Sequence, residues 1–162
     1  TGGKLITIDI NSKHIENAKQ STKEFKDVIE YITSDSVEYL ESMSDKEVEK
    51  VDFFYFDSYD FNVPDPIPSQ LHHFRELMAV YKRVSRDAIL SVDDNLPPGC
   101  WVTWNTFDGR GDIVSNKKYW GTPPNRWFGK GTLIDCFLTS EGWERINTYD
   151  KSSMQVLTYI LP

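Results

Sequence analysis

"VDFFYFDS", residues 51–58, carries apolar side chains at consecutive positions rather than at every second one. A continuous apolar run of this length predicts a strand that is covered on both faces, as in a parallel sheet flanked by helices. Parallel neighbours need long crossover connections that are usually helical. We therefore expect strands and helices to alternate on either side of this run.

The segments before residue 51 follow that order twice. Strands are expected at 4–10 ("KLITIDI") and 28–35 ("VIEYITSD"), and helices at 11–25 and 36–43. Asn11 or Ser12 can cap the first helix, and Asp35 can cap the second, by accepting a bond from unpaired first-turn amides.

The segments after residue 58 continue the pattern and then change it. They predict a helix at 69–84, a strand at 88–93, a helix at 132–142, and a terminal hairpin formed by 143–149 and 154–161. The expected fold is α/β, with a Rossmann-like, doubly wound, mostly parallel sheet and an antiparallel C-terminal hairpin. We expect a single domain over residues 1–162.

Composition excludes several classes of function. A net charge of −7 disfavours nucleic acid as a partner, because binding a polyphosphate needs clustered cations. No apolar run approaches the roughly 20 residues of a membrane-spanning helix, and no export signal opens the chain, so we expect no membrane contact and a cytoplasmic location. Cys100 and Cys136 lack metal-type spacing and are expected to be reduced.

Acidic residues close four successive predicted strands: Asp9, Asp35, Asp57, and Asp93 with Asp94. In doubly wound sheets, ligands bind outside the carboxyl ends of the strands, so these carboxylates should converge on one cleft. For any single residue the alternative is a helix cap or a turn. Asp9 stands where such folds place an acid that binds ribose hydroxyls.

The stretches "IDI", "SDS", "FDSYD" and "VDDN", with the terminal hairpin, resemble the class I S-adenosylmethionine-dependent methyltransferases. The resemblance spans most of the chain, through short motifs. It implies S-adenosylmethionine as cofactor, with Asp9 on the ribose and Asp35 and Ser36 on the adenine. Tyr59 is the match for an aromatic residue that stacks on the adenine ring.

"FDSYD" and "VDDN" also look like the divalent-metal, catechol-type O-methyltransferases of that class. This resemblance implies Asp57, Asp94 and Asn95 as metal ligands, and their hard oxygen atoms suit Mg²⁺. The metal would lower the pKa of an acceptor hydroxyl and orient it. The alternative is that residues 93–95 form only a polar turn before two prolines.

Two features depart from that family. The strand and glycine-rich turn that normally open it are absent, and in its strand order this strand lies between the Asp9 and Asp57 strands. We expect that the sequence lacks its N-terminal part; the alternatives are a strand supplied by a partner chain, or direct pairing of the two neighbours. A lysine base after Asp57 is also absent, so His73 is expected as general base or as an extra metal ligand, beside Asp57 as the other catalytic residue. The alternative is a structural role for His72 and His73.

Residues 96–129 are expected to form a long irregular lid rich in aromatic and basic residues. Its tryptophans are expected to contact an acidic or glycosylated small-molecule acceptor: Trp101, Trp104, Trp120 and Trp127. The alternative is a satellite core or a homo-oligomer interface. The leading prediction is an O-directed methyltransferase; the alternatives are a nonenzymatic remnant or binding module and, less favoured, an NAD-dependent oxidoreductase.

Overall fold

A computed structural model describes residues 2–107, 113–146 and 155–161, with only the backbone described for 101–120. The strands are β1 (Leu5–Asp9), β2 (Ile29–Thr33), β3 (Phe53–Phe56), β4 (Ile89–Leu96), β5 (Trp101–Phe107), β6 (Ile113–Gly121), β7 (Phe128–Gly129), β8 (Glu144–Arg145) and β9 (Gln155–Ile160). The helices are α1 (Ser12–Ser21), α2 (Ser36–Ser42), α3 (Asp45–Val48), α4 (Ile67–Val80) and α5 (Thr132–Ser140), with a 3₁₀ turn, η1, at Lys23–Phe25.

Strands and helices alternate as expected from the start of the chain to β4. The side chain of Asn11 caps α1 by accepting a hydrogen bond from the amide of Lys13 at 3.0 Å. Asp35 caps α2 through the amides of Val37 and Glu38, at 2.9 and 3.1 Å. Both capping predictions are therefore confirmed.

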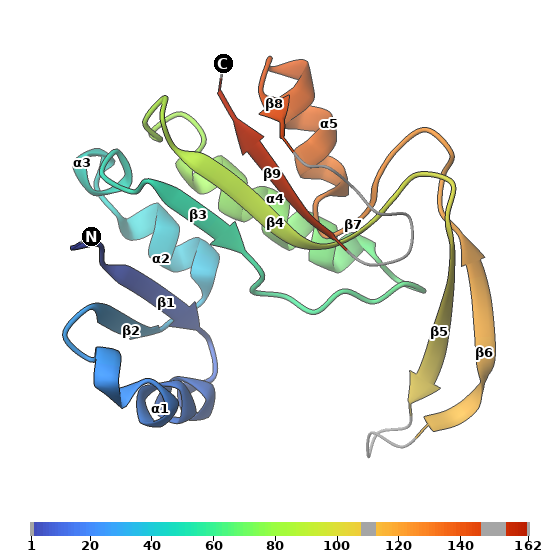
Figure 1. Cartoon of the computed structure of the whole chain (residues 1–162), viewed down its shortest axis with the longest axis horizontal. Helices are drawn as coiled ribbons and strands as arrows, with labels where there is room; N and C mark the ends of the chain where they lie inside the picture. The colour runs from blue at the N-terminus through green and yellow to red at the C-terminus, as the bar shows by residue number, and fades with distance from the viewer. Residues whose placement is uncertain (1, 108–112, 147–154, 162) are drawn as a thin grey trace.

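The strand order confirms a Rossmann-like α/β fold with a terminal hairpin. β1 pairs with β2 in parallel, and β3 pairs with β4 in parallel. β9 then inserts antiparallel between β4 and β8, which gives the order β3-β4-β9-β8 (Figure 1). The connection between the two expected hairpin strands, 143–149 and 154–161, lies outside the described residues.

Within the described residues, β1 and β3 are not hydrogen-bonded to each other, so the strands form separate sheets. This rules out direct pairing of these two strands, one of the three arrangements considered for the departure from the family. The amide of Leu5 and the carbonyl of Asp9 form hydrogen bonds on the side of β1 that faces β2, and the carbonyl of Asp52 forms one on the side of β3 that faces β4. Successive residues of a strand direct their amides and carbonyls to opposite edges, so Ile6, Ile8, Phe53 and Tyr55 direct theirs toward the open edges.

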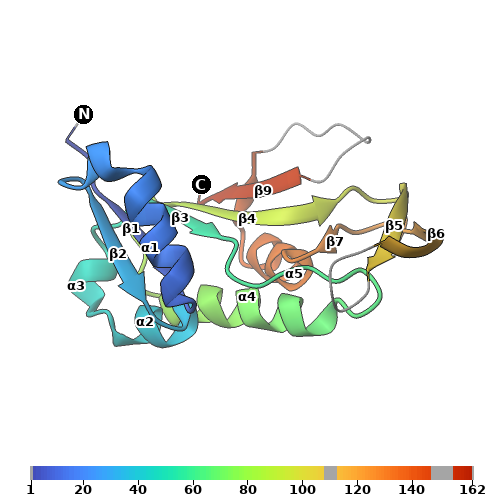
Figure 2. The same cartoon turned by 90° about the horizontal axis from the view of Figure 1, so that it is seen from below.

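The main core lies between the β3-β4-β9 strands and the helices α4 and α5, which cover one face (Figure 2). Leu77, Leu90, Leu138 and Tyr159 are almost completely buried there. In β3, Phe54 and Phe56 are buried while Phe53 and Tyr55 are about half exposed. The expectation that both faces of residues 51–58 are covered therefore holds for one face only.

Residues 96–129 are more regular than expected. β5 and β6 pair antiparallel as a hairpin that projects beyond the end of β4, and β7 returns to pair with β4 (Figures 1 and 2). Prolines at 97, 98, 123 and 124 flank the hairpin, and because proline is rare inside strands they favoured the prediction of an irregular segment. No helix in the described ranges is long and apolar enough to cross a membrane.

Candidate functional site

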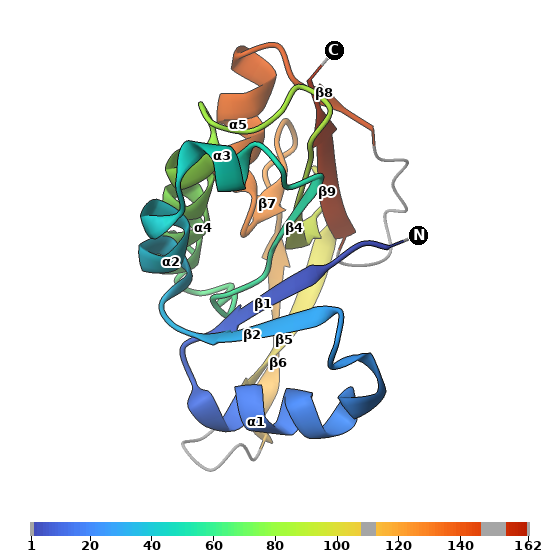
Figure 3. The same cartoon turned by 90° about the vertical axis from the view of Figure 1, so that its left-hand side faces the viewer.

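A cavity of about 620 Å³ lies between the β1-β2 sheet and the β3-β4-β9-β8 sheet, on the open edges of β1 and β3. Figure 3 shows β1 and β2 in front of the β3-β4-β9 strands, with α2 beside α4. The wall of the cavity is formed by β1, the segment from Ser34 to Ser36, part of α2, and β3 with the loop to Tyr59. Two side chains of α4, His72 and Glu76, complete it. The end near the last residues of β1, β2 and β3 is polar, whereas the walls along the strands are mainly apolar.

All four residues expected to bind the cofactor line this cavity: Asp9, Asp35, Ser36 and Tyr59. Asp57, at the end of β3, lines it as well. The expected convergence of strand-end carboxylates thus occurs for three of the strands. Asp93 and Asp94, on β4, are not part of the cavity wall.

Asp9 is held in place by the turn that joins β1 to α1. One carboxylate oxygen accepts from the amide of Asn11 at 2.7 Å, and the other lies 3.0 Å from Nδ1 of His14. The side chain is still about one-third exposed. Asp9 therefore presents a fixed, partly solvated acceptor at the polar end of the cavity.

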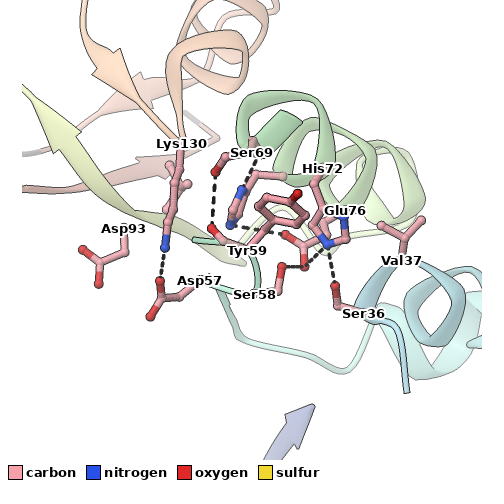
Figure 4. A network of polar contacts seen from close by, with 12 residues as sticks. Ser36, Val37, Asp57, Ser58, Tyr59, Ser69, His72, Glu76, Asp93 and Lys130 are labelled. Atoms are coloured by element: carbon pink, nitrogen blue, oxygen red, sulfur yellow. Dashed lines mark hydrogen bonds and ion pairs between the residues drawn. The ribbon is translucent and has the colours of Figure 1, made fainter. Parts of the chain in front are cut away.

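Asp35 and Ser36 open α2 and have different partners. One oxygen of Asp35 caps the helix, so the structural alternative for this residue is correct, although the residue also lines the cavity. The hydroxyl of Ser36 lies 3.0 Å from Nε2 of His72 and joins α2 to α4 (Figure 4).

Glu76, on α4, is the centre of a buried polar network at the cavity wall. Its Oε1 accepts from the hydroxyl of Ser58 at 2.6 Å and lies 3.8 Å from Nε2 of His72 (Figure 4). Its Oε2 lies 4.0 Å from Nε2 of His73, and neither of those two atoms has a hydrogen-bond partner among the described residues. Only 2% of the Glu76 side chain is exposed. Glu76 was not among the predicted site residues, although its spacing of three and four residues from the histidines is a usable signal.

His72, not His73, lines the cavity. His73 is fully buried, with its Nδ1 2.7 Å from the carbonyl of Ser69. Burial lowers the pKa of His73, more than the opposing effects of Glu76 and the Ser69 carbonyl raise it. The expected general base thus lies in the core, whereas the ring of His72 lies beside that of Tyr59, tilted by 37°, with ring centres 5.4 Å apart.

Two of the three predicted metal ligands, Asp57 and Asp94, form ion pairs with a lysine. The ammonium of Lys130 forms ion pairs with Asp57 and, at 2.9 Å, with Asp94 (Figure 4 shows the Asp57 contact). Burial alone would lower the pKa of Lys130, but hydrogen bonds to Asp57 and Asp94 and their negative charges raise it overall. Lys130 is therefore a cation at neutral pH. Among the described residues, no group of three or more histidine, cysteine, aspartate or glutamate side chains is placed to hold a metal ion.

Asn95 is not available as a ligand, because its amide is fully buried and bonded to the main chain. Its Nδ2 donates to the carbonyls of Val92 and Asp93 at 3.0 and 2.8 Å, and its Oδ1 accepts from the amide of Gly131 at 2.8 Å. The prediction of Asn95 as a metal ligand is corrected to a structural role.

The acids beside Asn95 also have local roles. Asp93 accepts a hydrogen bond from the hydroxyl of Tyr55; burial and this bond raise the pKa of Tyr55. Asp94 has a φ of +53°, at an irregularity where the register of β4 with β9 shifts. Residues 93–95 thus belong to the strand rather than to the polar turn considered as the alternative.

One of the four predicted substrate tryptophans is a core residue. Trp127 is 2% exposed and packs in the main core, with the guanidinium of Arg145 5.4 Å from its ring centre. It cannot contact an acceptor in this position. Trp101 and Trp104 lie in β5 and Trp120 in β6, and their side chains are outside the described part of the structure.

No protein-family model and no curated protein matches the sequence. The structure is similar to the crystal structure of the PH0226 protein from Pyrococcus horikoshii OT3, with a TM-score of 0.53 and 11% sequence identity. The match covers 98% of this chain and 74% of that one. At this identity the similarity concerns the fold alone, and the chain has a Rossmann-like α/β fold.

Proposed function

We propose that this chain is an S-adenosylmethionine-dependent methyltransferase domain that acts on an oxygen of a small or glycosylated acceptor. The observation that carries the proposal is that Asp9, Asp35, Ser36 and Tyr59 line one cavity at the carboxyl ends of the strands. These are the four residues that the resemblance in sequence implies for cofactor binding. The antiparallel insertion of β9 between β4 and β8 supports the same resemblance.

Each residue suits its proposed role. Asp9 offers carboxylate oxygens to ribose hydroxyls, and Asp35 has a second oxygen beyond the one that caps α2. The ring of Tyr59 is about half exposed and can stack on a planar base. S-adenosylmethionine would supply an electrophilic methyl group to this site.

Transfer to oxygen requires a group that removes the acceptor's hydroxyl proton. His72 is the candidate, because it lines the cavity with 16% of its side chain exposed. Its Nε2 would take the proton and give up its contact with the Ser36 hydroxyl, while the methyl group passes to the acceptor oxygen and S-adenosylhomocysteine leaves. The carboxylate of Glu76, 3.8 Å away, would stabilise the resulting imidazolium.

Calorimetric titration with S-adenosylhomocysteine tests the cofactor site. We expect saturable binding that weakens at least tenfold in Asp9→Asn, which keeps the size of the side chain but removes its charge. The matched control is Asp27→Asn, an exposed position outside the cavity wall, which should bind as the wild type does. Equal binding by both variants, or tighter binding of NAD, would refute the proposal.

A second candidate function follows from the open strand edges. Ile6, Ile8, Phe53 and Tyr55 direct main-chain amides and carbonyls toward the cavity, and Phe53 and Tyr55 are about half exposed. An extended apolar peptide segment could pair with such edges by strand addition. The domain would then be a binding module rather than an enzyme.

Fluorescence polarisation with a labelled seven-residue peptide of alternating valine and threonine, flanked by lysines, tests this alternative. Strand addition predicts saturable binding and slowed amide exchange at Ile6 and Ile8. The control peptide carries proline at its centre, which has the same charge but lacks a main-chain donor. Equal binding of the two peptides would exclude pairing through the backbone.

A further inference from the structure

The carboxylates of Asp57 and Asp94, near the ends of β3 and β4, are paired with the ammonium group of a lysine of the same chain. Lys130 lies in the short connection between β7 and α5, far along the chain from both acids, and its ammonium contacts Asp57 and Asp94. Lys130 is 2% exposed, whereas the two acids are 46% and 35% exposed. The positive charge is thus enclosed by protein, and the negative charges face outward around it.

The loop that carries Lys130 fits closely against β4. The amide of Lys130 donates to the carbonyl of Asp94 at 3.3 Å, and Gly131 donates to Asn95. A methyl group at Gly129 would lie 2.7 Å from Cα of Asn95, and one at Gly131 would lie 2.6 Å from a methyl group of Val92. Only glycine on both sides of the lysine allows this approach, so the backbone fixes where the ammonium lies.

We propose that Lys130 occupies the cation position of the Asp57–Asp94 pair and takes the place of the divalent ion that the sequence motifs imply. Two carboxylates brought this close repel each other unless a positive charge lies between them, and the ammonium of Lys130 forms an ion pair with each of them. Asn95, the third expected ligand, is committed to the backbone on both its polar atoms. The site binds no divalent ion while the lysine is in place.

This inference is independent of the proposed methyl transfer, because it concerns ion binding alone. Removal of the ammonium should leave two partly exposed carboxylates free to bind a hard cation. Lys130→Ala should therefore gain a site for Mn²⁺, with a dissociation constant on the order of 10⁻⁴ to 10⁻³ M, as in weak oxygen-ligand sites. The wild type and the charge-retaining Lys130→Arg should not bind at these concentrations.

Electron paramagnetic resonance of free Mn²⁺ measures this directly, and a rise in melting temperature with added Mn²⁺ gives a second readout. The double variant Lys130→Ala with Asp94→Asn should lose the gained site. Lys130→Met, which keeps the length of the side chain, replaces the alanine variant if that protein does not fold. Mn²⁺ binding by the wild type, or no gain in either Lys130 variant, would overturn the inference.

Discussion

Replacement of Asn95 by leucine tests whether this residue supports the fold rather than a metal. The two side chains are similar in size, and the change removes three hydrogen bonds of 2.8 to 3.0 Å, two of them buried and one partly buried. Each bond contributes about 1 kcal/mol net, and a buried main-chain amide left without a partner costs about 1–3 kcal/mol more. The amide of Gly131 would be such a group. We expect a loss of about 3–5 kcal/mol, a large part of the 5–15 kcal/mol typical of a domain.

Urea denaturation followed by circular dichroism measures this loss. The matched control is Asn17→Leu, at an exposed position of α1, which should change the free energy of unfolding by less than about 0.5 kcal/mol. A loss below 1 kcal/mol in Asn95→Leu, or one equal to that of the control, would show that the amide is not the structural element described.

Two further variants test the packing and the charges around the site. Gly129→Ala should destabilise the domain by about 1–3 kcal/mol in thermal unfolding, because its Cβ would meet the backbone of Asp94 and Asn95, whereas Gly3→Ala, in open space, should have little effect. The pKa of His73 is lowered in the folded state, so below about pH 6.5 the unfolded state binds more protons than the folded state does. The free energy of unfolding of the wild type should therefore decrease as the pH is lowered through this range. His73→Gln should reduce this loss of stability by up to about 1.4 kcal/mol per pH unit, as measured by urea denaturation at pH 5–8. An identical pH dependence in the two proteins would contradict the buried, neutral state of His73.

Much of the fold could be predicted because it depends on local patterns. Apolar runs located β1 to β4, and capping residues such as Asn11 and Asp35 marked helix starts. The position of acids at strand ends predicted that Asp9, Asp35 and Asp57 would share a cavity. The strand missing from the family pattern left open whether β1 and β3 pair directly, and the structure shows that these two strands do not.

The predictions that failed depend on contacts between distant segments. Nothing near Lys130 in the sequence indicates that its ammonium contacts Asp57, 73 residues away, and so the metal site was predicted without it. His73 lies four and seven residues before the buried Leu77 and Val80, and this helical spacing already favoured a structural role for His73 over the catalytic one that was predicted. Trp127 was grouped with its neighbours by composition, although its side chain belongs to the core.

Nuclear magnetic resonance of the ¹⁵N-labelled chain, titrated with S-adenosylhomocysteine, tests the central claim most directly. We expect saturable shifts of the amides of Asp9, Ser36 and Tyr59, which line the polar end of the cavity, and unchanged amides in α5, which does not line it. An absence of shifts in the folded chain, or shifts spread over surfaces outside the cavity, would contradict the proposed cofactor site.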